Sequence, residues 1–216
     1  MESNKREVRT MTGGKWQPRL REANESGESR TIEGYAIVFG VESVILADYW
    51  ENYREIIEPG AITEERLKDM DIKMTMYHNR EKLLARSNRG EGTLKLSVDE
   101  VGVHYEFEAP NTEDGNTALE LVKRGDLSGS SFMYWADEKS GVSYEKTKEG
   151  LLLRRVRTIG EIYDMTIAAD PAYTETTAMT REALERYMKP KKEVSSTRYT
   201  RERRERDLEL NNYLYD

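Results

Sequence analysis

The alternation of apolar and polar positions along the chain predicts a domain built mainly of strands. Thr31–Phe39 is rich in β-branched and aromatic residues, and Tyr53–Glu58 stops at the turn pair Pro59-Gly60. Further segments of this kind are Ile72–His78, Thr93–Val98, Val101–Ala109, Ser130–Ala136, Gly150–Thr158 and Ile159–Ala168. Such a succession of short strands favours an antiparallel barrel or another closed sheet.

Helical patterns are fewer. A short helix is predicted at Ala61–Met70, and a clearer one at Asn116–Arg124, which is followed by Gly125, a residue typical of helix ends. A third helix is predicted from Thr180 to Met188, with the threonine as its cap. We therefore expect a β-rich α+β domain at residues 31–188, an antiparallel β-barrel flanked by a few helices.

Both ends of the chain differ in character from this domain. Residues 1–30 are polar and contain Gly13-Gly14, which predicts a flexible leader with at most one early strand. Residues 189–216 form a charged C-terminal tail with few apolar positions, which is typical of a solvated helix or of disorder.

Composition excludes several classes of function. The 216 residues include no cysteine, so disulfides, thiolate metal sites and a cysteine nucleophile are excluded. No apolar run approaches the roughly 20 residues that span a bilayer, and the first residues lack the apolar core of a signal peptide, so we expect no membrane partner. With 34 Lys+Arg against 41 Asp+Glu and a net charge of -7, no general attraction to nucleic acid is expected.

One loop gathers hydroxyl groups. Ser128, Ser130 and Ser131 lie between the helix end at Gly125 and the apolar strand that begins around Phe132. Loops often collect serines for turn hydrogen bonds. A serine at the start of a rigid strand can instead be a nucleophile, with backbone N–H groups nearby to stabilise an oxyanion. The residues alone leave both interpretations open.

A serine nucleophile needs a base, and the chain has two histidines. His78 ends a predicted strand where a loop begins, a position that is held firmly yet faces solvent or substrate. His104 lies in the middle of another strand, on the polar face with Glu106 and Glu108. His78 is therefore the favoured base.

An acidic residue usually orients such an imidazole. The candidates after the serine loop are Glu161, Asp164 and Asp170. Asp164 stands inside an otherwise apolar strand, where a charge is costly unless it is paired, so it is favoured over Glu161. With two histidines and no HExxH motif, P-loop or GxGxxG fingerprint, we expect neither a metal nor a cofactor.

Five segments between about residues 30 and 175 complete the pattern. They are Ile32–Phe39, Arg54–Ala61, Met76–Asn79 (MYHN), Arg124–Phe132 (RGDLSGSSF) and Ile162–Tyr173. In this order they resemble the prohead (capsid maturation) serine proteases of tailed phages, which are relatives of the herpesvirus assemblin proteases.

The resemblance implies a fold and a site. The fold would be an assemblin-like barrel, and Ser131, directly before Phe132, would be the nucleophile. His78 would be the base, and Asp164 would be the third member, where the family more often has glutamate.

The resemblance also implies a biological role. Such endopeptidases act inside the immature phage shell, or prohead, in the host cytoplasm. There they cleave the scaffold protein or the major capsid protein, and often themselves. The herpesvirus relatives suggest a homodimer, and the tail at 189–216 would be a packaging or self-processed segment.

Two other classes of function stay open. One is a non-catalytic capsid assembly or scaffolding protein on the same fold. The other is a general β-barrel binding module, which would leave Ser131 unlabelled by a serine-directed phosphonate.

Overall fold

The computed structural model describes residues 7–12, 16–21, 29–47, 52–148, 150–169 and 173–174. The predicted helix at 180–188 and the charged tail at 189–216 lie outside these residues, so both stay predictions.

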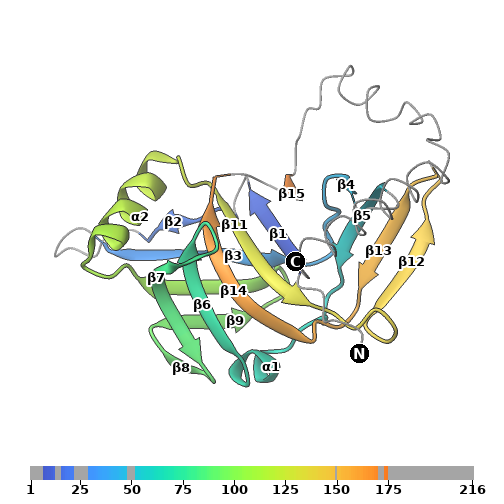
Figure 1. Ribbon diagram of the computed structural model, residues 1–216, viewed down its shortest axis with the longest axis horizontal. Helices are drawn as coiled ribbons and strands as arrows, with labels where there is room; N and C mark the ends of the chain where they lie inside the picture. The colour runs from blue at the N-terminus through green and yellow to red at the C-terminus, as the bar shows by residue number, and fades with distance from the viewer. Residues whose placement is uncertain are drawn as a thin grey trace, which may run out of the picture. The chain divides into compact units, whose positions relative to one another are not determined.

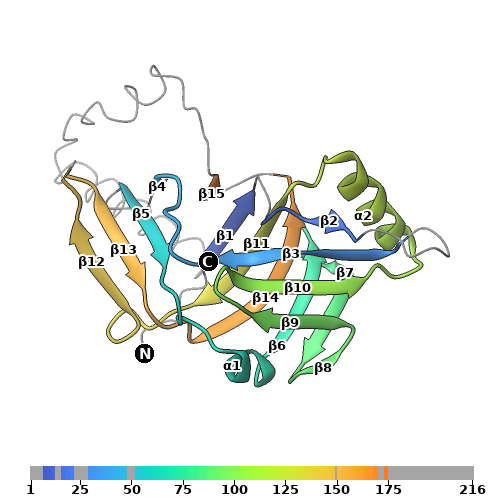
Figure 2. The same ribbon diagram turned by 180° about the vertical axis from the view of Figure 1, so that it is seen from behind.

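The strands form three sheets (Figures 1 and 2). The order in the first sheet is β15 (Tyr173–Thr174), β1 (Glu7–Thr12), β11 (Gly129–Trp135), β14 (Glu161–Ala168), β6 (Asp71–Met76), β7 (Asn79–Asn88) and β8 (Glu91–Gly92). The second sheet runs β2 (Arg19–Leu20), β3 (Thr31–Val38), β10 (Gly102–Glu108) and β9 (Leu94–Val98). The third runs β12 (Val142–Lys146), β13 (Leu152–Val156), β5 (Asn52–Ile57) and β4 (Leu46–Ala47).

The prediction of a β-rich domain with few helices is confirmed, and the closed antiparallel barrel is not. Within the described ranges each sheet has two end strands. Three of the strand pairs, β14 with β6, β13 with β5 and β1 with β15, are parallel. The sequence could not indicate this, because alternation within a strand says nothing about the direction of its neighbour.

A single hydrophobic core joins the first two sheets, and Figure 2 shows the strands of the second sheet running across the first. Phe132 of β11 and Met165 of β14 are buried in the same cluster as Tyr105 and Phe107 of β10 and Ile32 of β3. Burying side chains of this size stabilises a fold by about 1.5–3 kcal/mol each. This core makes β11 and β14 a rigid support for the side chains on their other face.

The two helices within the described residues have well-defined ends. In α2 (Glu113–Arg124) the Thr112 side chain accepts a hydrogen bond from the Gly115 N–H, and Gly125 closes the helix in the left-handed conformation, as predicted. The first helix, α1 (Glu64–Lys68), is shorter than predicted. Its flanking residues Ala61 and Met70 are nevertheless buried, which explains their apolar pattern.

Two predictions about strands need correction. Strand β6 ends at Met76, and Tyr77 and His78 form a two-residue turn that leads into β7, so the strand predicted at Ile72–His78 is two residues too long and His78 lies outside it. In residues 1–30 the sequence predicts at most one strand, whereas the structure has two, β1 and β2. Strand β1 lies between β15 and β11 in the first sheet.

Candidate active site

Ser131, His78 and Asp164 meet in the first sheet, although they come from three different elements. Ser131 belongs to β11, Asp164 to β14, and His78 to the turn after β6. His78 Nε2 lies 2.7 Å from Ser131 Oγ, and His78 Nδ1 lies 2.5 Å from Asp164 Oδ1. The imidazole thus bridges the serine and the carboxylate.

The sheet register explains why these groups meet. In the antiparallel pair of β11 and β14, Ser131 stands opposite Thr166 and Met133 stands opposite Asp164. Opposite residues of a ladder direct their side chains to the same face, so Ser131 and Asp164 share a face. Strand β6 runs parallel to β14 and leads directly into the turn that carries His78.

Burial sets the chemistry of the group. Ser131 and Asp164 are 0% and 2% exposed, whereas the His78 side chain keeps 20% of its surface. An ionised carboxylate only accepts hydrogen bonds, so the Nδ1–H of His78 donates to Asp164. Nε2 of the neutral ring is then an acceptor that faces Ser131, which is the arrangement that a general base requires.

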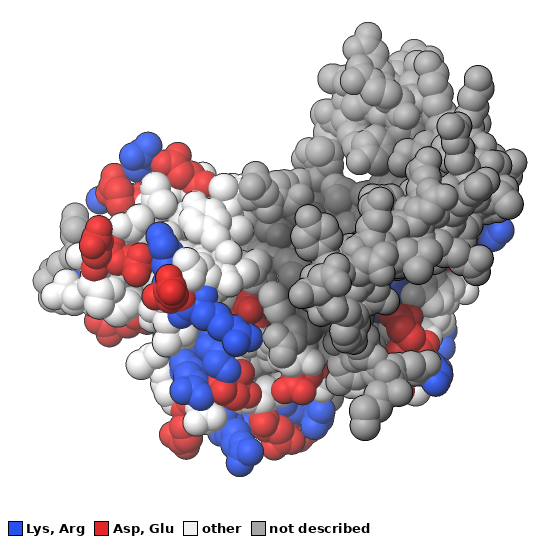
Figure 3. Space-filling model, viewed as in Figure 1, with Lys and Arg blue, Asp and Glu red and all other residues white. Residues whose placement is uncertain are grey.

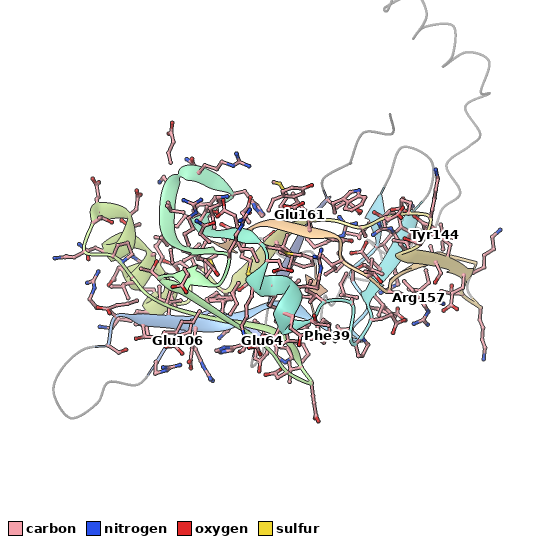
Figure 4. The ribbon with its side chains drawn as sticks, turned by 90° about the horizontal axis from the view of Figure 1, so that it is seen from below. Phe39, Glu64, Glu106, Tyr144, Arg157 and Glu161 are labelled. Atoms are coloured by element: carbon pink, nitrogen blue, oxygen red, sulfur yellow. The ribbon has the colours of Figure 1, made fainter. Side chains whose placement is uncertain are left out.

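The other candidate residues lie elsewhere. Ser130 is buried on the core side of β11, and its hydroxyl bonds to Tyr105 at 2.8 Å. His104 lies on β10 of the second sheet, where its ring contacts Tyr35 edge-on. Glu161, which Figure 4 labels at the start of β14, is exposed. Asp170 lies outside the described residues.

The model of the caudovirus prohead serine protease family matches residues 18–190, well over half of the chain. The chain belongs to this family. The resemblance that the order of five segments indicated is thereby confirmed. Among solved structures, the capsid assembly protease of bacteriophage T4 is similar, with a TM-score of 0.46 and 12% identity over 78% of this chain and 100% of that one. Among curated proteins, none matches the chain.

The backbone of strand β1 covers Ser131 on one side. In the antiparallel pair of β1 and β11, Thr10 stands opposite Ser131 and Arg9 opposite Phe132. The Ser131 hydroxyl donates to the Arg9 carbonyl oxygen at 2.7 Å. A hydroxyl carries one proton, so this bond competes with donation to His78 Nε2. The structure therefore has the three groups assembled and the Ser131 hydroxyl covered.

A buried ionic cluster attaches β1 to the third sheet. The Arg9 guanidinium makes two hydrogen bonds of 2.8 Å to the Glu55 carboxylate of β5. Arg154 of β13 bonds to the same carboxylate and, at 2.8 Å, to the Tyr134 hydroxyl. Both guanidinium groups also bond to Glu7 of β1, each at 2.7 Å.

The charges of this cluster depend on one another, because all its members are largely withdrawn from water. Burial raises the pKa of the Glu7 carboxyl, although the positive charges of Arg154 and Arg9 act in the opposite direction. Burial would lower the pKa of Arg154, but Tyr134, Glu55 and Glu7 raise it above its ordinary value. Removing one member leaves a buried charge without its partner, which is strongly destabilising.

Charges of both signs are mixed on the described surface. Figure 3 shows Lys and Arg interspersed with Asp and Glu over the described part of the visible face. Within the described ranges, no group of three or more metal-ligating side chains comes together. No helix of these ranges is long and apolar enough to cross a membrane.

Proposed function

We propose that the protein is a serine endopeptidase in which Ser131 is the nucleophile, His78 the general base and Asp164 the residue that orients the base. The observation that supports this proposal is the continuous chain of contacts from Asp164 Oδ1 through the His78 ring to Ser131 Oγ. An acidic residue, an imidazole and a serine in this order are the components of acyl transfer at neutral pH.

The proposed reaction has two halves. First, the Ser131 O–H bond breaks, its proton passes to His78 Nε2, and Oγ bonds to the scissile carbonyl carbon. The tetrahedral intermediate then collapses, the C–N bond breaks, and Nε2–H returns the proton to the leaving amine. In the second half a water molecule gives a proton to His78 Nε2 and its oxygen bonds to the ester carbonyl carbon. The C–Oγ bond then breaks, the proton returns to Ser131 Oγ, and the carboxylic acid product leaves.

The covered serine implies that the structure represents a closed form. A peptide bond cannot reach Ser131 while the hydroxyl is fully buried and bonded to the Arg9 carbonyl. Cleavage therefore requires that β1 move away from β11. This movement would also leave the edge of β11 unpaired, and an extended substrate segment can add to such an edge.

The substrates that we propose follow from the family to which the chain belongs. A prohead protease acts within the immature phage shell, so we propose that the chain cleaves the scaffold protein or the major capsid protein there, and also itself, in the host cytoplasm. An assemblin-like arrangement, a homodimer, and a packaging or self-processed role of residues 189–216 belong to the same proposal. So does a protease domain at 31–188, to whose sheets β1 and β2 of the predicted leader at 1–30 add strands.

Co-expression with the phage's major capsid protein and scaffold tests this function. We expect the wild-type chain to shorten one of them, and Ser131→Ala and His78→Ala to leave both intact. His104→Ala is the matched control and should cleave like wild type, since that ring lies in the second sheet. Continued cleavage by Ser131→Ala would rule out the proposed nucleophile.

A non-catalytic assembly or scaffolding protein is the second candidate, and the burial of Ser131 is the observation that favours it. It predicts that Ser131→Ala assembles proheads normally and that their proteins reach mature size.

A further inference from the structure

His78, the proposed base, has an unusual backbone conformation. Tyr77 and His78 form the two-residue turn between β6 and β7, with φ angles of 56° and 55°. Two successive left-handed residues make the turn that two-residue hairpins favour, but glycine and asparagine usually occupy it. Here both positions carry ring side chains, which cost free energy in this region. Contacts with the surrounding sheet must therefore hold the turn in place.

The contact that reaches His78 itself comes from Thr166 of β14. The His78 N–H donates to Thr166 Oγ1 at 3.0 Å, and the same hydroxyl donates to the Thr75 carbonyl oxygen of β6 at 2.8 Å. Thr166 is fully buried, so neither bond is exposed to competition from water. The hydroxyl thus links the end of β6 to the backbone nitrogen of His78.

The same strand fixes both ends of His78. Asp164, two residues before Thr166, bonds to the ring at Nδ1, and Thr166 bonds to the backbone nitrogen. Thr166 also stands directly opposite Ser131 in the ladder. The distance between His78 Nε2 and Ser131 Oγ is therefore set by two side chains of β14 and by the register of that strand with β11.

We infer that Thr166 is a positioning residue, whose hydroxyl places the His78 backbone so that Nε2 reaches Ser131. The inference rests on the proposed function and goes beyond its three side chains. A misplacement of about 1 Å at a reacting group can cost about 100-fold in rate. Loss of the hydroxyl should therefore lower the reactivity of Ser131 without removing any of the three groups.

Three variants of the full chain separate positioning from packing. Thr166→Val keeps the shape of the side chain and removes the hydroxyl, whereas Thr166→Ser keeps the hydroxyl and removes a methyl group. Thr75→Val is the matched control, because Thr75 is equally buried and stands opposite Thr166, but its hydroxyl faces the Met165 carbonyl and not the turn.

The probe is an alkyl fluorophosphonate. The rate of labelling is measured at several probe concentrations, which gives a maximal rate and an apparent binding constant. We expect Thr166→Val to lower the maximal rate about 10- to 100-fold with the binding constant unchanged. Thr166→Ser, although it opens a small cavity and melts earlier, should stay within about threefold of wild type, as should Thr75→Val. A structural role predicts the reverse order, with the serine variant the more impaired.

Hydrogen exchange of the His78 amide gives a readout that does not depend on reactivity. It should become at least about tenfold faster in Thr166→Val and stay unchanged in Thr75→Val. Unchanged exchange in Thr166→Val, or equal labelling rates of the valine and serine variants, would overturn the inference. If wild type itself is not labelled, the proposed function fails, and the exchange measurement still decides whether Thr166 sets the position of His78.

Discussion

The Asp164 carboxylate influences which nitrogen of the His78 ring carries the proton. It is almost fully buried and lies 2.5 Å from Nδ1, so it favours the tautomer whose Nε2 would accept the Ser131 proton in the proposed reaction. In Asp164→Asn the amide can donate to Nδ1, which moves the ring proton to Nε2 and removes the acceptor.

We expect Asp164→Asn to lower the labelling rate of Ser131 by about 10⁴-fold, the size of effect that this change has in other triads. Thermal unfolding should change little, since the side chains have the same shape. Glu161→Gln is the matched control, because Glu161 is exposed on the same strand, and it should label like wild type. Equal rates for Asp164→Asn and wild type would show that another group orients His78.

At this scale the sequence indicated His78 and Asp164 on physical grounds and Ser131 through the resemblance to the family, and the structure brings the three side chains together. Only two histidines were available, and an acid in an apolar strand required a partner. No local sequence pattern indicated three other features of the site. They are the hydrogen bond from Ser131 to the Arg9 carbonyl, the hydrogen bond from the His78 amide to the Thr166 hydroxyl, and the left-handed turn at Tyr77 and His78. Each joins segments whose register is fixed only when the sheet forms.

Strand β1 is the element that would have to move before a substrate could reach Ser131 in the proposed function. Its backbone covers the serine, and Arg9 attaches it to Glu55 by two hydrogen bonds. Weakening this attachment should therefore favour the open form.

We expect Arg9→Met to label at Ser131 at least about tenfold faster than wild type, because β1 loses its paired guanidinium and separates from β11 more often. Arg19→Met is the control, since the Arg19 side chain of β2 is largely exposed and pairs with Glu33 in the second sheet. Rates are measured by mass spectrometry of the intact protein. A rate for Arg9→Met no higher than that for Arg19→Met would show that β1 does not limit access.

The elements that alternation predicted were those with one apolar face. Strand β10 (predicted at 101–109) and helix α2 were found nearly in place. Strand β7 was not predicted, because its sequence NREKLLARSN is mostly polar and its pairing with β6 is irregular. Short edge strands such as β4 and β8 have too few residues to show a period.

At the scale of the whole described domain, a buried cluster of charges joins the first and third sheets. Glu55 is fully buried between Arg9 and Arg154, which lie 46 and 99 residues away in sequence. No sequence pattern could indicate this cluster, since its members meet only after β1, β5 and β13 are in place.

We expect Glu55→Gln to lower the free energy of unfolding by about 3–5 kcal/mol, because two guanidinium groups then lose a buried negative charge. Glu64→Gln, which removes an exposed pair with Lys68, should change it by about 0.5 kcal/mol or less. Urea unfolding measures both. Similar midpoints for the two variants would show that the cluster does not stabilise the fold.

Acid should destabilise the domain through its paired carboxylates. The charge-assisted hydrogen bonds from Arg86 and Lys73 hold the pKa of Asp71 below its ordinary value of 3.8. The unfolded chain therefore binds more protons, so this contribution to stability is present at neutral pH and is lost below about pH 4. Asp71→Asn should show a smaller fall in melting temperature between pH 6 and pH 3 than wild type; an identical fall would contradict this assignment.

Covalent labelling tests most directly whether Ser131 is a nucleophile that His78 activates. The intact chain is treated with an alkyl fluorophosphonate, and the adduct is located by peptide mass spectrometry. We expect a single adduct on Ser131 that is absent from Ser131→Ala and lost in His78→Ala. An adduct on Ser128 or Ser130 would contradict this expectation. The absence of any adduct from the wild-type chain or from Arg9→Met would contradict it as well.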